Sequence, residues 1–119
     1  MRDHRKLKAF QLADQVVLAV YQATRGFPKE EQFGLTSQLR RAGVSAVSNI
    51  VEGCARHSEA DYLRFLDMAF GSLQELQYQL SLALRLGYLS NNQYAPLEGS
   101  SQETCRVLAG LIRALRHKA

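Results

Sequence analysis

The 119-residue sequence has few of the residues that build crosslinked, fibrous or membrane-spanning proteins. Its two cysteines, Cys54 and Cys105, are too few for a disulfide framework or a zinc site, so we expect reduced, buried thiols. Two prolines and eight glycines exclude collagen-like and low-complexity chains. The longest uncharged apolar stretches, such as 15–24, reach only about half of the ~20 residues that a membrane span needs.

The N-terminal region has a basic start and then an apolar stretch, as a secretory signal peptide has. Gln11, Asp14 and Gln15 interrupt that stretch, which argues against secretion. We therefore expect a cytoplasmic protein of one domain, because compact domains mostly run to ~100–150 residues. Hydrophobic residues at 46% and charged residues at 22% are typical of a globular chain and not of a disordered one.

Motifs that carry enzyme chemistry are also missing. The chain has no glycine-rich phosphate loop, no Cys-x-x-Cys and no His-Glu-x-x-His. No glutamate is followed three residues later by histidine, which is the spacing of di-iron bundles. His4 and His117 fall in expected tails and His57 in an expected turn, which are poor positions for a preorganised base. We therefore expect a protein that is not an enzyme and that holds no cofactor and no metal.

Helical periodicity fills the spaces between the few glycines and prolines. The spacing predicts helices over about 9–25, 35–54, 59–86 and 101–117, and no segment shows the alternation of a half-buried strand. Short connections between such helices favour an all-α fold, an up-down-up-down four-helix bundle that forms one domain over 1–119. The third helix carries a four-three seam like that of a coiled coil, made of Tyr62, Leu66, Ala69, Leu73, Leu76, Leu80 and Ala83.

Glycine, serine and proline indicate where these helices begin and end. Gly26 is expected to end the first helix in a left-handed cap, and Ser58 to begin the third by accepting from the amide of Asp61. Ser90 heads a similar pattern. Because Pro96 should break or kink whatever begins there, we place the start of the last helix after it.

The first two helices carry more apolar surface than one bundle buries. At 100° per residue, the apolar positions of the first cover an arc of ~200°, whereas a single bundle needs a stripe only somewhat wider than ~100°. On the second helix, Val44, Val47 and Val51 extend the core face sideways. We expect these valines to form the interface of a homo-oligomeric ring. The alternative is that the small residues of 42–46 let the helices pack closely inside a single bundle.

Basic residues concentrate in the two ends of the chain. Fifteen Lys and Arg against eleven Asp and Glu give a net charge of +4, which permits a polyanionic partner. In an up-down-up-down bundle, both chain ends and the end of the second helix lie at one end of the molecule. The candidate cations for a phosphate backbone are Arg2, Arg5, Lys6, Lys8, Arg41, Arg56, Arg106, Arg113, Arg116 and Lys118. The alternative is that these are ordinary solvated charges that complement the helix dipoles.

Five stretches, taken together in their order and spacing, resemble one bacterial family. They are FGLTSQLRRA at 33–42, SNIVEG at 48–53 with Arg56, FL at 65–66, AFGSLQEL at 69–76 and LGYL at 86–89. The chain resembles the four-helix bundle family named for proteins encoded in intervening sequences of 23S ribosomal RNA genes. That family is similar to the accessory variability protein of diversity-generating retroelements. The resemblance covers nearly the whole chain.

The resemblance implies an up-down four-helix bundle, a homopentameric ring and a suspected role in binding nucleic acid. In the retroelement relatives it also implies docking to a reverse transcriptase, and it implies no enzymatic activity. The chain departs from the family at 46–47, where Ala-Val replaces a common Ile-Pro, so the second helix should be straighter. The motif residues fall here at Gln38, Arg40, Arg41, Asn49, Glu52, Gly53, Arg56, Gly71, Ser72 and Glu75.

Two functions of different classes fit the sequence. The first is an oligomeric protein that binds RNA or DNA through its basic surfaces without base specificity. Trp is absent and most Tyr and Phe fall at core positions, so backbone electrostatics is the binding mode that the sequence supports. The alternative is a scaffold or accessory subunit whose surface docks another protein, such as a reverse transcriptase, with the basic ends incidental.

Overall fold

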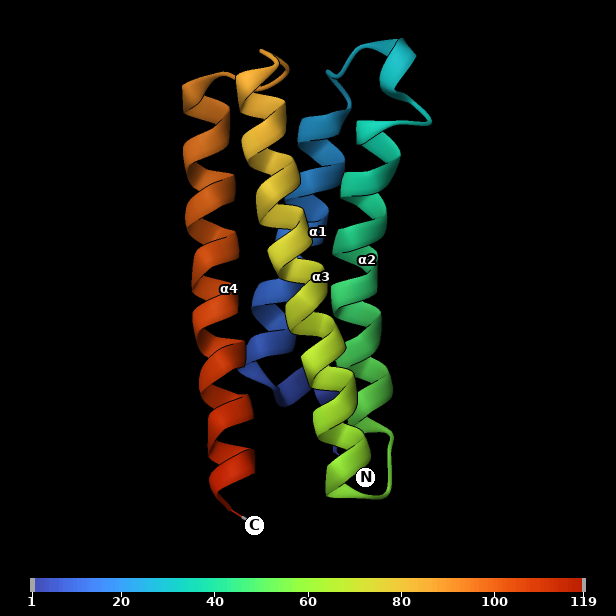
Figure 1. The fold of residues 1–119 in the computed structure, drawn as a ribbon, viewed down its shortest axis with the longest axis vertical. Helices are drawn as coiled ribbons and strands as arrows, with labels where there is room; N and C mark the ends of the chain where they lie inside the picture. The colour runs from blue at the N-terminus through green and yellow to red at the C-terminus, as the bar shows by residue number, and fades with distance from the viewer. Residues whose placement is uncertain (1, 119) are drawn as a thin grey trace.

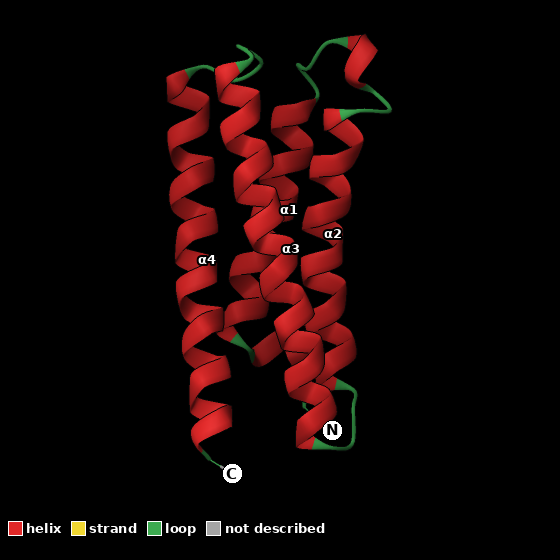
Figure 2. Cartoon of the chain, viewed as in Figure 1, coloured by secondary structure: helices red, strands yellow, loops and turns green. Residues whose placement is uncertain are grey.

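A computed structural model describes residues 2–118, which form an antiparallel bundle of four long helices (Figure 1). The helices are α1 (Lys8–Thr24), α2 (Leu35–Cys54), α3 (Glu59–Arg85) and α4 (Asn91–His117). Short 3₁₀ turns at His4–Lys6 and Lys29–Glu31 precede α1 and α2. Within residues 2–118 only helices and connecting loops occur (Figure 2). The predicted all-α four-helix fold is therefore confirmed.

The helices form a square in which each packs on two neighbours. α1 contacts α2 and α4, and α3 contacts the same two helices. The bundle is elongated, with extents of 46 × 23 × 20 Å. The α1–α2 and α3–α4 connections lie at one end, which we call the upper end (Figure 1). The α2–α3 connection and both ends of the chain lie at the other, the lower end.

Two apolar clusters fill the interior, one toward each end of the bundle. The lower cluster contains several alanines, among them Ala9, Ala13 and Ala46, whereas the upper cluster is built on larger aliphatic and aromatic side chains. Small side chains let helix backbones approach closely. All seven residues of the predicted α3 seam are at most 3% exposed, so the coiled-coil-like spacing identified the buried face of α3.

The ends of α1 and α3 follow different rules. Gly26 lacks the left-handed conformation expected of it, because successive short-range bonds such as Phe27 N–H to Thr24 O tighten the last turn instead. Gly87 is the residue with positive φ, at +81°, where α3 ends. The predicted cap at the start of α3 is present, with the Asp61 amide 3.1 Å from Ser58 Oγ.

Helix α4 begins at Asn91, ten residues before its predicted start, so the expected boundary at 101 is wrong. A reciprocal cap starts the helix, in which Ser90 Oγ accepts from the Gln93 amide at 3.2 Å and Gln93 Oε1 accepts from the Ser90 amide at 2.8 Å. Pro96 lies exposed in the second turn, where its missing N–H costs only one bond on the solvent side. The extra turns bury Leu97 in the upper cluster.

The two upper connections are joined through Glu31. One carboxylate oxygen accepts from the Leu35 amide at 2.9 Å and caps α2, and the other accepts from the Tyr88 hydroxyl at 2.8 Å. These hydrogen bonds stabilise the charged carboxylate and lower the pKa of Glu31. The Tyr88 ring also lies 5.5 Å from that of Phe27, so the α1–α2 and α3–α4 connections are tied by both polar and aromatic contacts.

Candidate nucleic-acid interface

The lower half of the bundle carries the whole net charge of the protein. It comprises residues 2–13, 48–70 and 107–118, which hold nine Lys and Arg against five Asp and Glu. The rest of the chain holds six of each and is neutral. Because α1 begins and α2 and α4 end at the lower end, the antiparallel topology gathers cations that are far apart in sequence.

Of the ten candidate cations, the structure places eight in this lower half. Arg41 lies in the upper half of α2, and Arg106 lies near the middle of α4 with Glu103 as its ion-pair partner three residues earlier. The eight that lie together are Arg2, Arg5, Lys6, Lys8, Arg56, Arg113, Arg116 and Lys118.

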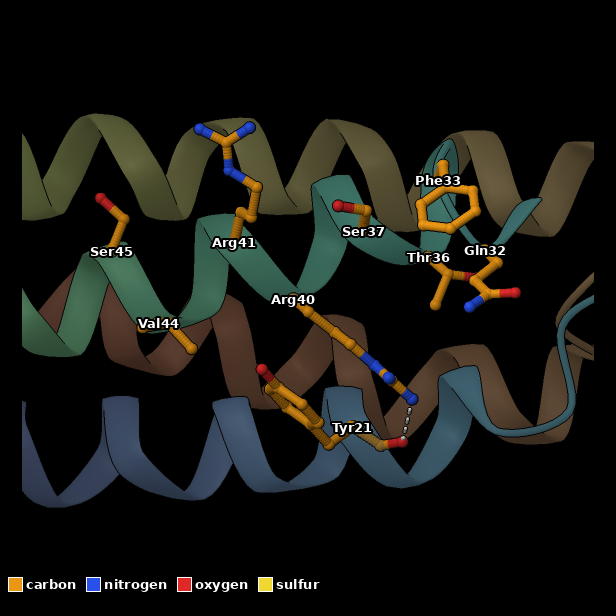
Figure 3. A pocket seen from close by; sticks show the side chains of 9 residues that line it. All are labelled: Tyr21, Gln32, Phe33, Thr36, Ser37, Arg40, Arg41, Val44 and Ser45. Atoms are coloured by element: carbon orange, nitrogen blue, oxygen red, sulfur yellow. Dashed lines mark hydrogen bonds between the residues drawn. The ribbon is translucent and has the colours of Figure 1, made fainter.

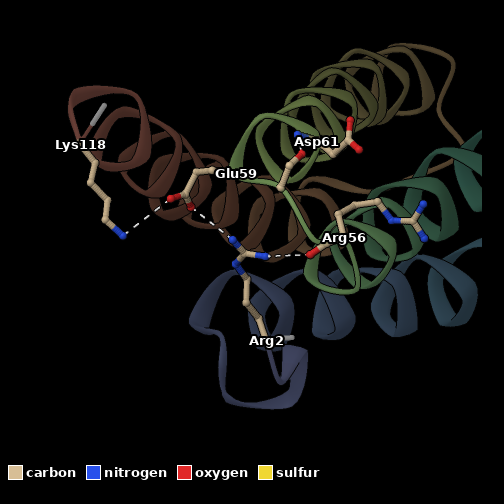
Figure 4. Close-up of polar contacts among 6 residues, drawn as sticks. Arg2, Arg56, Glu59, Asp61 and Lys118 are labelled. Carbon is tan, nitrogen blue, oxygen red and sulfur yellow. Dashed lines mark hydrogen bonds and ion pairs between the residues drawn. The ribbon is translucent and has the colours of Figure 1, made fainter.

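Arg2 anchors the N-terminal segment to the start of α3 (Figure 4). Its guanidinium lies 3.3 Å from Glu59 Oε1, donates to the Arg56 carbonyl at 3.3 Å and stacks 3.9 Å above the Tyr62 ring. Lys118 reaches the other oxygen of Glu59 at 3.8 Å, so one carboxylate holds cations from both ends of the chain. The Glu59 carboxylate thus partly neutralises the charges of Arg2 and Lys118.

Two more cations of the lower end are paired with acids. Arg5 bonds the carboxylate of Asp3 through its Nε at 3.0 Å, and this bond lowers the pKa of Asp3. Arg116 of α4 reaches across to Asp67 of α3. Exposed pairs of this kind contribute about 0–1 kcal/mol, but they reduce the positive field that a phosphate would meet.

Four cations of the lower end form no ion pair with another described residue. They are Lys6, Lys8, Arg56 and Arg113, and all four are exposed. The guanidinium of Arg56 lies 5.4 Å from the centre of the Phe65 ring, which supports its stem without neutralising its charge. These four are the cations of the lower end that are free to meet an anion.

Polar side chains that lie along α2, among them Arg41, Ser45 and Asn49, form a polar stripe, and part of this stripe is used inside the protein. Ser45 Oγ and Ser72 Oγ are 2.9 Å apart, which joins α2 to α3. The Asn49 side-chain amide donates back to the Ser45 carbonyl at 2.9 Å and to its hydroxyl at 3.2 Å. Arg41 and Glu75 line the same small hollow of about 210 Å³ without forming an ion pair. Ser45 and Asn49 are therefore only partly free to bind a ligand.

Arg40, another motif residue, is structural. Its Nε donates to Thr24 Oγ1 at 2.9 Å and an Nη donates to the Tyr21 carbonyl at 3.3 Å. The guanidinium also lies 4.6 Å from the centre of the Tyr21 ring. These contacts fix α2 against the end of α1.

The three predicted interface valines differ in exposure. Val44 is 43% exposed, whereas Val47 and Val51 are half-buried and Val47 packs against the lower cluster. Phe33, which lines a hollow together with Val44, is more exposed, at 89%, and so is Leu18 of α1, at 64%. Sequence spacing did not single out Phe33, because it lies in a loop where periodicity does not separate covered from exposed aromatics.

Burial changes the ionisation of two thiols and one phenol among the described residues. Cys54 and Cys105 are free and buried, and burial raises the pKa of both thiols. Burial also raises the pKa of Tyr62 to about 12. Among residues 2–118 there is no group of three His, Cys, Asp or Glu placed to hold a metal ion. None of the described helices combines the length and the apolar character that crossing a membrane demands.

Comparisons with known proteins agree with this fold. A crystal structure of a protein with unknown function from the S23 ribosomal protein family of Bacteroides thetaiotaomicron is similar, with a TM-score of 0.78 and 24% identity. The similarity covers 87% of this chain and 97% of that one. No curated protein matches the sequence. A family model described as 23S rRNA-intervening sequence protein matches residues 5–110. Because the match spans most of the sequence, the chain belongs to the 23S rRNA-intervening sequence protein family.

Proposed function

We propose that this is a non-enzymatic cytoplasmic protein that binds the backbone of RNA or DNA through its lower end. The observation that carries the proposal is the location of the whole net charge of +4 in one half of the bundle. A polyanion is attracted to such a surface because each phosphate that it neutralises releases condensed counterions. The neutral upper half gives no comparable attraction.

Lys6, Lys8, Arg56 and Arg113 are the cations that would meet phosphates. Lys6 lies in the turn before α1 and Lys8 begins α1, while Arg56 lies in the α2–α3 connection and Arg113 near the end of α4. None of the four is paired with a described acid. Contacts to phosphate carry no base information, so binding should depend little on sequence.

Salt-dependent binding tests the proposal. Fluorescence anisotropy would be measured with labelled RNA and duplex DNA, each in two unrelated sequences, from about 50 to about 200 mM salt. We expect the association constant to fall steeply with salt and to differ little between sequences. Weak binding that does not respond to salt would contradict the proposal and favour the scaffold function.

We also propose that copies of the chain associate through the outer side of α1 and α2, as a ring for which the family resemblance implies five subunits. The exposure of Leu18 on α1 and of Val44 on α2 supports this, since large apolar side chains left exposed on neighbouring helices are typical of interaction surfaces. Native mass spectrometry should show no dominant monomer at micromolar concentration. Val44→Glu with Val51→Glu should shift the mass toward the monomer, and an unchanged mass would exclude the valines as the interface.

A further inference from the structure

A groove runs along the upper part of α2, with Val44 near its lower end, and no acidic side chain lines it. It has a volume of about 620 Å³ and extends from the α1–α2 connection to Val44. Figure 3 shows Tyr21 and Phe33 at its walls and Arg40 and Arg41 along α2. The lining therefore combines apolar surface with two positive charges and several hydroxyl groups.

Phe33 is the most unusual side chain of the groove. It is 89% exposed, although the 3₁₀ turn before it and α2 after it hold the backbone in place. Tyr21 is 40% exposed on the opposite helix. Aromatic and arginine side chains supply most of the binding energy of protein interfaces, and here two of each surround one hollow.

The two arginines of the groove differ in their freedom. Arg40 is held by Thr24 and by the Tyr21 carbonyl, so its guanidinium is positioned before any partner arrives. Arg41 is exposed and pairs with no described acid. No side chain of the lining neutralises the charges of the two arginines, so an occupant that carries carboxylates would form ion pairs with them.

We propose that the groove docks an amphipathic helix of a partner protein, with aliphatic side chains set between Tyr21 and Phe33 and with flanking carboxylates at Arg40 and Arg41. A helix laid in a groove presents side chains at i, i+3, i+4 and i+7, which suits an elongated hollow parallel to α2. The inference deepens the docking alternative. Tyr21 and Phe33 lie nearer the upper end than Leu18 and Val44, so a helix in the groove would adjoin the proposed contact between copies and not replace it. The inference is independent of nucleic-acid binding, because the groove lies outside the positively charged lower half. Tyr21, Phe33 and Val44 give the lining apolar surface that suits a peptide better than a nucleic-acid backbone.

Synthetic peptides test the proposal. The first probe is a fluorescein-labelled amphipathic helix with a leucine stripe flanked by glutamates, and its matched control carries lysines in place of the glutamates. We expect the acidic peptide to bind at least about tenfold more tightly than the basic one. Equal binding of the two peptides, or no binding by either, would overturn the proposal.

Variants locate the binding. Phe33→Ala and Arg41→Glu should each weaken binding of the acidic peptide by about tenfold, and neither replaces a buried side chain. The matched controls are Tyr78→Ala and Arg85→Glu on α3, which are exposed outside the groove and should leave the peptide affinity unchanged. Equal losses in both sets would overturn the proposed location.

Two further measurements separate the other occupants. If Phe33→Ala or Arg41→Glu changed the native mass of the free protein, the groove would be a contact between copies and the proposal would be wrong. Weaker binding of a single-stranded oligonucleotide by Phe33→Ala than by the wild type would assign the groove to nucleic acid instead. If Phe33→Ala and Arg41→Glu bind nucleic acid as the wild type does, the proposed nucleic-acid binding by the lower end is unaffected by the result of the peptide experiments.

Discussion

Glu59 shows how a single residue sets the charge that the lower end presents. Its two carboxylate oxygens hold Arg2 and Lys118, which come from opposite ends of the chain. The spacing of the sequence identified the cations but not these pairings, because Glu59 lies 57 residues from Arg2 and is brought near it only by the tertiary fold. Arg116 and Asp67, 49 residues apart, are a second case.

Glu59→Gln should increase affinity for RNA and DNA, because it releases two cations at the proposed interface. We expect a gain of about threefold to tenfold at ~0.1 M salt and a steeper salt dependence. Stability should fall by less than about 1 kcal/mol, as for other exposed pairs. Glu103→Gln is the matched control, since it changes the net charge equally and frees Arg106 away from the lower end. An equal gain in both variants would show that net charge alone governs binding.

Two motif glycines should respond in opposite ways to alanine. A Cβ at Gly53 would lie 3.0 Å from Phe65 Cβ and 3.3 Å from Tyr62 Cδ1, so Gly53→Ala should destabilise the protein by about 1–3 kcal/mol. A Cβ at Gly71 would meet nothing within 4 Å, so Gly71→Ala should stabilise α3 by about 0.5–1 kcal/mol. Urea denaturation measures both, and a neutral Gly53→Ala would contradict the close packing of α2 on α3.

At the scale of elements, the helices were largely predictable from local signals and α4 was the exception. Periodicity predicted α2 and α3 within one residue of their observed ends, because their buried stripes are regular. Pro96 misled the prediction of α4, since the rule that proline ends helices is weaker near a well-capped N-terminus. The sequence indicates the cap at Ser90. Whether the stabilisation from this cap outweighs the cost of Pro96 also depends on the burial of Leu97, which the sequence pattern does not give.

Ser90→Ala should therefore loosen the beginning of α4. Loss of the side-chain cap should cost about 1 kcal/mol and speed hydrogen exchange over 91–97 more than in the rest of the helix. Pro96→Ala should act in the opposite direction, because alanine restores one backbone hydrogen bond. Unchanged exchange in Ser90→Ala would mean that packing alone holds these turns.

The junction of the two upper connections should make stability depend on pH. Hydrogen bonds from Leu35 and Tyr88 lower the pKa of Glu31 in the folded state, so the unfolded chain binds a proton at higher pH than the folded one. The stabilisation is fully present above the unfolded pKa, about 4.5, and is lost as pH falls through the folded value.

Comparison with Glu31→Gln measures this contribution. The difference in unfolding free energy between wild type and Glu31→Gln should be larger at about pH 6 than at about pH 3. Glu30→Gln serves as the control, because its side chain forms no hydrogen bond with another described residue. A difference that did not change with pH would contradict the assigned role of Glu31.

At the scale of the whole molecule, the sequence predicted the fold and the end at which charge collects. Both follow from chain order, because short connections between regular helices make neighbours antiparallel and bring both chain ends to one side. The groove beside Phe33 could not be predicted from the order of the helices. A groove depends on which side chains of two helices leave space between them, and spacing along one helix does not contain that information.

The most direct test of the central claim compares two variants that remove the same charge from opposite halves. The lower variant replaces Lys8, Arg56 and Arg113 by Gln, and the upper variant replaces Lys29, Arg25 and Arg85 by Gln. All six side chains are exposed. Native mass spectrometry would check that both variants keep the assembly of the wild type. We predict that the lower variant loses affinity for RNA and DNA, with a salt slope smaller by about 2–3, while the upper variant keeps most of both. Equal behaviour of the two variants would contradict a nucleic-acid interface at the lower end.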